Sequence, residues 1–349
     1  MASLLNQIPR ESLQNLLSSL RVCALPSGNH ISTESCALEP LLSSLSRGDV
    51  IEVQGPASSG KTHLLYHFVL LCIAPSKQVS MNFGGNGMVA VVYDTDATFD
   101  VARLHQLLLN RLSLTLHHNM EIARRLAEES LQRLHVFRPT SLLQLATSLL
   151  YLPFYHRACI PEHEIGLLAV DSVSAFYWAD RFIAEQMRNM PQIAQEEPDP
   201  ALLNPLQLVL TALGRLRLSH APFIVLTNWG LNLASQSSGP VTFYKQHLHS
   251  FPVYSENYDP SAPPTSMTGD LPPTPMPLSL THHITLSPVS IPPFAPEISL
   301  RDAVQQEVQY RGSTVQKGEI TGLVRTAGSR EIRRLTLCIT LENVHIRYL

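Results

Sequence analysis

Short runs of apolar residues recur along the chain, and each ends in a polar residue or a glycine. The clearest runs cover residues 50–55, 88–94, 166–171 and 222–228. They are rich in valine, isoleucine and leucine and show little alternation, which is typical of strands buried on both faces of a parallel sheet. A weaker run at 134–138 also predicts a strand.

Segments with helical spacing of apolar residues follow these runs. They cover residues 63–73, 101–112, 141–152 and 206–218. Alternation of strand and helix indicates right-handed βαβ units. The predicted fold class is therefore α/β, with a mostly parallel, doubly wound sheet.

Proline changes this picture in one region. Residues 230–299 contain 13 of the 26 prolines in the 349-residue chain. Because proline lacks an N–H donor and is excluded from helix interiors and central strands, we predict a long, largely disordered loop here. Beyond it, the pattern predicts a helix at 298–308 and edge strands at 319–325 and 333–341.

Charge and cysteine content exclude several classes of protein. The net charge of −3 argues against a general polyanion binder. The five cysteines are widely spaced, without a Cys-x-x-Cys pair, so a reducing compartment fits best. The first 20 residues make a poor signal peptide, and the longest apolar stretch, 68–74, is far short of the ~20 residues that span a membrane. We therefore expect no membrane association.

The strongest chemical signal is a complete G-x-x-x-x-G-K-[ST] motif between the first predicted strand and helix. Its residues are Gly55, Pro56, Ala57, Ser58, Ser59, Gly60, Lys61 and Thr62. In such a loop, backbone N–H groups and the helix amino terminus face a phosphate. We expect Lys61 to reach the β- and γ-phosphates of a nucleotide and the Thr62 hydroxyl to hold Mg²⁺.

Two acidic positions follow other predicted strands. Asp171 ends the run at 166–171, where a carboxylate can bind a water on Mg²⁺. Asp96 follows the run at 88–94, and two interpretations of it stay open. It can orient or deprotonate a water that attacks the γ-phosphate, or it can cap the start of the next helix. No metal other than Mg²⁺ is indicated.

Three segments resemble the RecA-type ATPase core of eukaryotic recombinase paralogues. They are GPASSGKT at 55–62, DTDATF at 94–99 and VDSVSAFYWADR at 170–181. The resemblance covers about residues 45–230, and the aromatic run after Asp171 is its most distinctive part. It implies a P-loop fold with a RecA-like core that binds ATP and Mg²⁺.

The same resemblance implies a function. Such paralogues assist the main recombinase in homologous-recombination repair of DNA double-strand breaks, as subunits of heteromeric complexes in the nucleus. We therefore expect another recombinase paralogue subunit as partner, and single-stranded or branched DNA as a ligand reached through the complex. With about 45 residues before its core, this chain is expected to accept a neighbour's linker segment without extending one.

The resemblance over 45–230 and the proline content of 230–299 together predict a division of the chain. We expect an amino-terminal helical or linker segment, a RecA-like ATPase core, a proline-rich disordered insertion, and a carboxyl-terminal helix with edge strands that complete the core. Their predicted bounds are 1–44, 45–229, 230–299 and 300–349.

Two positions depart from active recombinases. Asp96 stands where the family has Glu, so its carboxylate is one methylene shorter. Trp229 stands where the family has a Gln that senses the γ-phosphate, and an indole has one donor and no amide acceptor. We therefore expect ATP to bind and to turn over very slowly in this chain alone, with Asp96 a doubtful catalytic residue.

The segments expected near DNA have weak signals. Residues 230–299 carry one lysine against four acidic residues, and their aromatic residues can stack on bases or simply lie in a linker. The aromatic residues concerned are Tyr244, Phe251, Tyr254 and Tyr258. Near the carboxyl terminus, Arg325, Arg330, Arg333 and Arg334 form either a solvated hairpin face or a contact with DNA or a partner.

Two other functions remain open alternatives. One is a stand-alone DNA-dependent ATPase or strand-exchange recombinase, and the other is another P-loop ATPase or kinase. The shorter carboxylate at Asp96, the indole at Trp229 and the acidic loop favour the recombination-mediator subunit over the first alternative.

Overall fold

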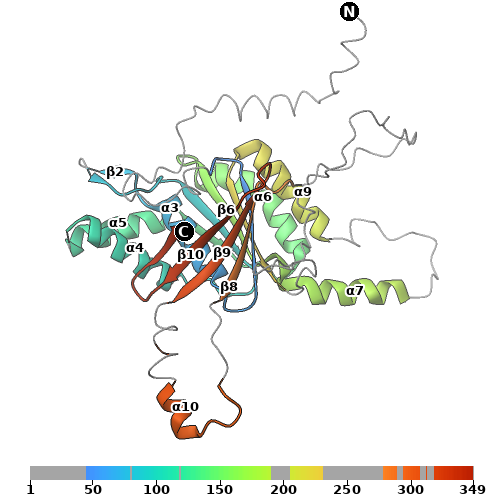
Figure 1. The fold of residues 1–349 in the computed structure, drawn as a ribbon. Coiled ribbons are helices and arrows are strands. Elements are labelled where there is room, and N and C mark those ends of the chain that lie inside the picture. The colour runs from blue at the N-terminus through green and yellow to red at the C-terminus, as the bar shows by residue number, and fades with distance from the viewer. Residues whose placement is uncertain are drawn as a thin grey trace, which may run out of the picture.

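A single large sheet organises the described part of the chain (Figure 1). The structure is a computed structural model, and it describes residues 45–78, 81–117, 119–189, 205–230, 278–288, 294–306, 312 and 318–348. The strands of the large sheet are β1 (Val50–Gly55), β4 (Val89–Asp94), β5 (Leu134–Phe137), β6 (Ile165–Asp171), β7 (Phe223–Trp229), β8 (His282–Pro288), β9 (Glu319–Thr326), β10 (Ile332–Ile339) and β11 (Val344–Tyr348).

The sheet is parallel over most of its width. The strand order is β11-β10-β9-β8-β1-β7-β6-β4-β5. All neighbours from β8 to β5 pair in parallel, whereas β9, β10 and β11 pair antiparallel to their neighbours. The mostly parallel α/β sheet predicted from the apolar runs is therefore confirmed.

Helices cover both faces of this sheet. One core lies between the sheet and α3, α4 and α5, and a second core lies between the opposite face and α6 and α9. The bounds are α3 (Lys61–Ile73), α4 (Val101–Thr115), α5 (Met120–Leu131), α6 (Leu142–Cys159) and α9 (Pro205–His220). The shorter elements are the pair β2 (Lys77–Gln78) and β3 (Met81–Asn82), the 3₁₀ turn η2 (Val173–Phe176), α7 (Tyr177–Asn189) and α10 (Leu300–Gln306). Figure 1 shows α7 and α10 extending away from the sheet.

The helix after the predicted phosphate loop is enclosed on all sides. Every residue of α3 from 64 to 73 is buried. Side chains of β1 and β6 pack on it, and so do Leu337 and Ile346 from the C-terminal strands, since all belong to one apolar core. The ring nitrogen Nδ1 of His67 lies 3.2 Å from the carbonyl oxygen of Val344. The C-terminal strands therefore support the phosphate loop through α3.

Polar side chains interrupt the apolar interior where β1 meets β8. Glu52 and Gln54 on β1 are fully buried, as is His283 on β8. His283 Nε2 lies 3.1 Å from Gln54 Oε1 and 3.8 Å from Glu52 Oε2, and Arg325 Nη2 on β9 lies 3.1 Å from His283 Nδ1. From the other side, Asn228 Nδ2 donates to Glu52 Oε1 over 3.1 Å. We call these five residues the seam cluster.

The neutral form of His283 explains this arrangement. Burial, and then the charge of Arg325, lower the pKa of His283 to about 3. A neutral imidazole protonated at Nε2 donates toward Gln54 and accepts from Arg325 at Nδ1. Its contact with Glu52 is therefore not an ion pair, and Glu52 raises the pKa of Arg325 against the effect of burial.

The predicted insertion at 230–299 is wrong for residues 278–288. Residues 282–288 form β8, which pairs with β1 and β9 inside the sheet. Leu278 and Leu280, just before β8, are buried in the second core. Pro277 precedes this stretch and Pro288 ends the strand, so the prolines flank the apolar run and leave its ladder intact. Residues 231–277 and 289–293 lie outside the described residues, as do residues 1–44.

The C-terminal strands are also placed differently from the prediction. Both predicted edge strands, at 319–325 and 333–341, are interior, because β9 lies between β8 and β10 and β10 lies between β9 and β11. The edge strand on this side of the sheet is β11, which the pattern did not predict. The helix expected at 298–308 is described as α10, over Leu300–Gln306.

Candidate nucleotide-binding site

The carboxyl ends of four parallel strands form the candidate site. In the register of the sheet, Gly55 lies opposite Trp229, and Asp94 lies opposite Asp171. Since β7 lies between β1 and β6, the predicted phosphate loop and the acidic strand end face the same edge of the sheet. Ligands of open α/β sheets bind outside this edge.

All eight residues of the predicted phosphate loop lie between the end of β1 and the start of α3. Ser58 and Gly60 have positive φ angles of 59° and 80°, which curl the loop back toward the helix. A Cβ atom at Gly55 would lie 2.3 Å from Ser59 Oγ and 2.8 Å from the Leu286 carbonyl oxygen, so only glycine fits there. The first turn of α3 contains no acidic residue, which leaves its amino terminus suited to an anion.

Lys61 is held against the loop. Its Nζ donates to the carbonyl oxygens of Gly55, over 3.0 Å, and Pro56, over 2.8 Å. Burial lowers the pKa of Lys61, while the charges of Asp171 and Asp96 raise it. The ammonium group therefore lies at the mouth of the loop with two carboxylates in its electrostatic neighbourhood.

Thr62 and Asp171 meet directly. Thr62 Oγ1 donates to Asp171 Oδ2 over 2.8 Å, and the other oxygen, Oδ1, accepts from the Thr227 hydroxyl. Burial raises the pKa of Asp171, and the two hydroxyl donors oppose this rise. Sequence reasoning did not single out Thr227, although its position near the end of β7 is the signal that points to it.

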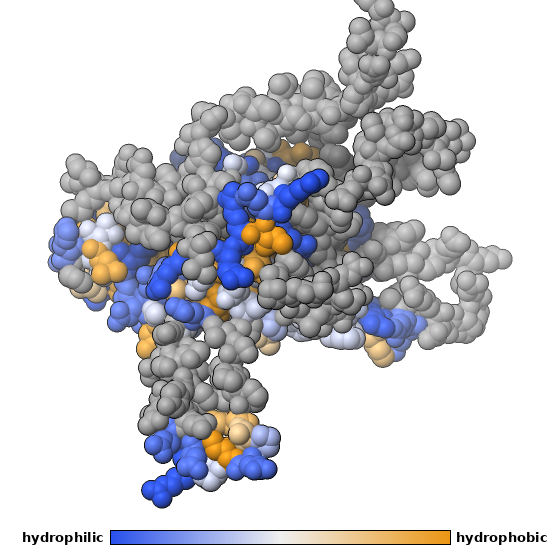
Figure 2. Space-filling model, in the orientation of Figure 1, coloured by the Kyte–Doolittle hydropathy of each residue, from blue (hydrophilic) through white to orange (hydrophobic). Residues whose placement is uncertain are grey.

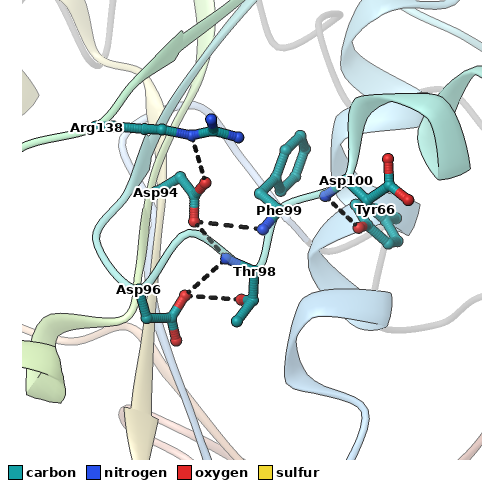
Figure 3. A network of polar contacts seen from close by, with 7 residues as sticks. All are labelled: Tyr66, Asp94, Asp96, Thr98, Phe99, Asp100 and Arg138. Atoms are coloured by element: carbon teal, nitrogen blue, oxygen red, sulfur yellow. Dashed lines mark hydrogen bonds and ion pairs between the residues drawn. The ribbon is translucent and has the colours of Figure 1, made fainter.

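Asp96 lies in the loop after β4, and its Oδ1 is engaged within that loop (Figure 3). Asp96 Oδ1 accepts from Thr98 Oγ1 over 2.7 Å and from the Thr98 N–H over 3.3 Å. The N-cap of α4 is Asp100, whose side chain accepts from the Ala102 N–H. Asp96 thus stabilises the turn before α4, whereas the cap of that helix is Asp100.

An ion pair between a buried carboxylate and an exposed arginine supports the same loop. Asp94 is buried, and its Oδ1 accepts from the backbone N–H groups of Thr98 and Phe99, over 3.0 and 3.3 Å. Arg138, after the end of β5, donates from Nε to Asp94 Oδ2 over 3.0 Å (Figure 3). The sequence pattern ended the fifth predicted strand at Arg138 without assigning it a role, and the structure shows that it fixes Asp94.

Trp229 ends β7 beside η2. Its backbone N–H is shared between Ser174 Oγ, at 3.0 Å, and Asn228 Oδ1, at 2.9 Å. Asn228 belongs to the seam cluster. Trp229, which stands in the expected sensor position, therefore contacts both the loop after Asp171 and the interior of the sheet.

The segments expected near DNA are described only in part. Tyr244, Phe251, Tyr254 and Tyr258 lie outside the described residues. Of the C-terminal arginines, Arg325 is half-buried in the seam cluster, whereas Arg330, Arg333 and Arg334 are exposed where β10 begins. Among the described residues, no helix is long and apolar enough to cross a membrane.

A phosphate loop between β1 and α3, with an acidic strand end two strands away in a mostly parallel sheet, defines a RecA-like P-loop fold. Among curated proteins, the chain is similar to the mouse DNA repair protein XRCC2, at 36% identity over 134 residues that cover 38% of this chain and 43% of that protein. It is also similar to the DNA repair protein XRCC2 homolog of Arabidopsis thaliana, at 27% identity over 212 residues, or 52% of this chain and 55% of that protein.

The chain spans about half the length of the curated relatives that it matches. No family model matches it. The chain is thus similar to DNA repair proteins of one name from an animal and a plant.

Proposed function

We propose that this protein is an ATP-binding recombinase-paralogue subunit that assists homologous-recombination repair of DNA double-strand breaks. It acts within a heteromeric complex in the nucleus and hydrolyses ATP weakly or not at all on its own. The similarity to two DNA repair proteins supports the repair role.

The observation that carries ATP binding is the contact between Thr62 and Asp171. A hydroxyl and a carboxylate oxygen lie 2.8 Å apart at the start of α3, beside Lys61. Hard oxygen donors of this kind are the ligands that Mg²⁺ prefers, and few of them are needed because Mg²⁺ keeps waters and binds nucleotide phosphates. When bound with ATP, Mg²⁺ neutralises charge on the β- and γ-phosphate oxygens.

Different residues of this chain bind different parts of the nucleotide. The N–H groups of the phosphate loop and the start of α3 face the phosphates, and Lys61 supplies a compact positive charge. To reach a phosphate, Lys61 exchanges its two carbonyl partners for phosphate oxygens. Thr62 and Asp171 hold the metal side of the nucleotide.

Slow hydrolysis follows from Asp96 and Trp229. Asp96 Oδ1 already accepts two hydrogen bonds from Thr98, and its side chain is one methylene shorter than the glutamate of active recombinases. General-base catalysis contributes about 10²–10⁴-fold and needs a base within hydrogen-bond reach of its proton. Trp229 presents an indole where an amide would contact the γ-phosphate.

The test measures binding and turnover separately. Binding of a fluorescent ATP analogue with excess Mg²⁺ is compared for the wild type, Lys61→Ala and the control Arg124→Ala, which removes an exposed charge on α5. We expect at least a tenfold loss of affinity for Lys61→Ala and no change for the control. Equal binding by the wild type and Lys61→Ala would contradict nucleotide binding at this loop.

Phosphate release then tests the proposal of weak turnover. We expect a wild-type rate far below the ~1 s⁻¹ at the low end of ordinary enzymes. The double variant Asp96→Glu/Trp229→Gln should release phosphate faster, because it restores the longer carboxylate and the amide. Robust turnover of the wild type alone, lost in Lys61→Ala, would support a stand-alone ATPase instead.

Affinity purification tests the complex. A second RecA-like subunit should co-purify in near-equal amount with the tagged full-length chain. Its absence with both the wild type and Lys61→Ala would remove the heteromeric part of the proposal and leave ATP binding untouched.

A further inference from the structure

We propose that the turn joining β9 to β10 is a contact surface for the phosphate backbone of duplex DNA, formed by Arg330, Arg333 and Arg334. We call it the arginine hairpin. The choice of DNA as the polyanion rests on the proposed role in DNA repair. The position of the contact surface rests on the structure.

The arginine hairpin lies at the edge of the sheet opposite the nucleotide site. The Ala327 N–H donates to the Thr281 carbonyl oxygen over 2.8 Å, and Thr281 Oγ1 accepts from the Val50 N–H over 3.0 Å. Val50 begins β1, whereas the phosphate loop follows the end of that strand. A nucleotide and DNA bound at these two places would not compete for space.

The turn is well ordered by its own hydrogen bonds. The Ser329 N–H donates to the Thr326 carbonyl oxygen over 3.1 Å, and Gly328 between them has a positive φ of 83°. The Glu331 N–H donates to Ser329 Oγ over 3.1 Å. From residue 332 onward the β9–β10 ladder continues without a break. The backbone that carries the three arginines is therefore pre-organised, which lowers the entropic cost of binding.

The three arginines differ from other arginines of the same edge, which have hydrogen-bond or ion-pair partners among the described residues. Arg217 donates to the carbonyl oxygens of Gly48 and Ser279, and Arg47 pairs with Glu164 and with backbone carbonyls. These guanidinium groups serve the fold.

By contrast, Arg330, Arg333 and Arg334 are exposed and make no hydrogen bond or ion pair within the described part of the chain. Their donors are free for a ligand.

The charge of this surface stands out in the chain. Residues 325–334 contain four arginines and one glutamate, in a protein whose net charge is −3. Figure 2 shows hydrophilic side chains gathered over the exposed end of the hairpin. A guanidinium group binds phosphate through two parallel N–H bonds, so a cluster of arginines suits a polyanion with regularly spaced phosphates.

The composition favours duplex over single-stranded DNA. Sites for single strands combine positive charge with aromatic side chains on which bases stack. Residues 325–334, which form the hairpin end, contain no Phe, Tyr or Trp, and the aromatic residue that pairs beside them is Tyr348, opposite Leu335. A surface with arginines alone can contact the backbone, which is what a closed duplex exposes.

The test is a salt titration of DNA binding. Anisotropy of a labelled duplex and of a single strand of the same length is measured with the full chain at several salt concentrations. The variants are Arg330→Ala/Arg333→Ala/Arg334→Ala and a control triple, Arg124→Ala/Arg125→Ala/Arg157→Ala, which removes three exposed arginines from α5 and α6.

We expect the hairpin variant to bind the duplex at least tenfold more weakly at low salt. The slope of log affinity against log salt should become shallower by about 1 to 2, since each phosphate contact contributes about 0.9 for duplex DNA and the consecutive residues Arg333 and Arg334 point to opposite faces of β10. The control triple should keep the wild-type slope. A third variant with lysine at the three positions should recover most of the slope, because lysine keeps the charge.

Three outcomes would overturn the inference. They are an unchanged slope in the hairpin variant, an equal loss in the control triple, and wild-type protein that does not bind the duplex. Tighter binding of an acidic peptide than of the duplex would assign the surface to a protein partner instead. ATP binding measured on the same samples separates this failure from failure of the proposed nucleotide site.

Discussion

The parallel strands and the C-terminal strands of one sheet bury different kinds of residue. Every residue of β4 and of β6 is buried, and nearly all of them are apolar. In β10, by contrast, the first three residues are exposed and buried residues follow. Helices cover both faces of the parallel strands, whereas the C-terminal strands pack chiefly on α3. A sheet covered on one face keeps charged residues such as Arg334 on the other.

The two parts of the sheet also differ in whether their charged side chains already have partners. At the carboxyl edge of the parallel strands, Lys61 and Asp171 are already paired with loop atoms and hydroxyls. At the far edge of the C-terminal strands, exposed arginines have no such partners in the described residues. The two parts of the sheet meet at the seam cluster. Substitutions there and nearby test how far each part depends on the other.

The largest expected effect is at Glu52. Glu52→Leu removes a buried carboxyl group and leaves Arg325 and Asn228 without it. We therefore expect the free energy of unfolding to fall by about 3–5 kcal/mol. Urea denaturation measures this. Glu52→Gln keeps an acceptor for Asn228 and should lose less. A loss below about 1 kcal/mol for Glu52→Leu would show that the seam does not hold the two parts together.

A smaller effect is expected at Gly60, where the C-terminal strands touch the phosphate loop. Its φ is 80°, and a Cβ atom there would lie 2.6 Å from Ile320 Cδ1. We expect Gly60→Ala to cost about 2 kcal/mol of stability and to weaken ATP binding, because a left-handed backbone and a close contact are both penalised.

The double variant Gly60→Ala/Ile320→Ala separates the two causes. It should recover the ATP affinity lost through the close contact and keep the loss caused by the backbone angle. If Gly60→Ala binds ATP like the wild type, the C-terminal strands do not shape the loop.

The smallest effect, when expressed for each pH unit, is expected from the dependence of stability on pH at His283. Its pKa is lowered to about 3 in the folded protein, against about 6.5 in the unfolded chain. The unfolded chain therefore binds a proton first, so this stabilisation is complete above pH 6.5 and is lost as the pH falls toward 3. The slope is at most about 1.4 kcal/mol per pH unit.

Chemical denaturation between pH 7 and pH 4.5 measures this slope. His283→Gln should flatten it, and the control His163→Gln, at an exposed position, should keep the wild-type slope. Equal slopes in all three proteins would mean that folding leaves the pKa of His283 unchanged.

The parallel strands could be predicted because burial on both faces leaves a continuous apolar run. The run at 50–55 matches β1 in full, the predicted strands for β4, β5 and β6 differ by one residue at one end, and the one for β7 differs by one residue at both ends. β8 was missed because its prolines were read as part of a disordered insertion. The apolar residues Ile284 and Leu286 between them alternate with polar ones and were the signal for a strand.

The candidate site could be predicted where it depends on local order. The loop from Gly55 to Thr62 and the strand end at Asp171 are sequence-local features, and the structure brings them together. The engagement of Asp96 with Thr98 and the support of Asp94 by Arg138 depend on side-chain direction and on a strand more than 40 residues away. No periodicity in the sequence encodes such contacts.

The sequence is enough to specify the parallel strands β1, β4, β5, β6 and β7, the predicted phosphate loop and the acidic strand ends, because apolar periodicity and backbone freedom act over a few residues. The tertiary structure adds that β8 enters the sheet beside β1, that Glu52 and Arg325 belong to one polar cluster inside the sheet, and that the arginine hairpin lies opposite the candidate nucleotide site. These features join residues far apart in the chain, and their energies come from burial and charge pairing that exist only once the sheet has formed.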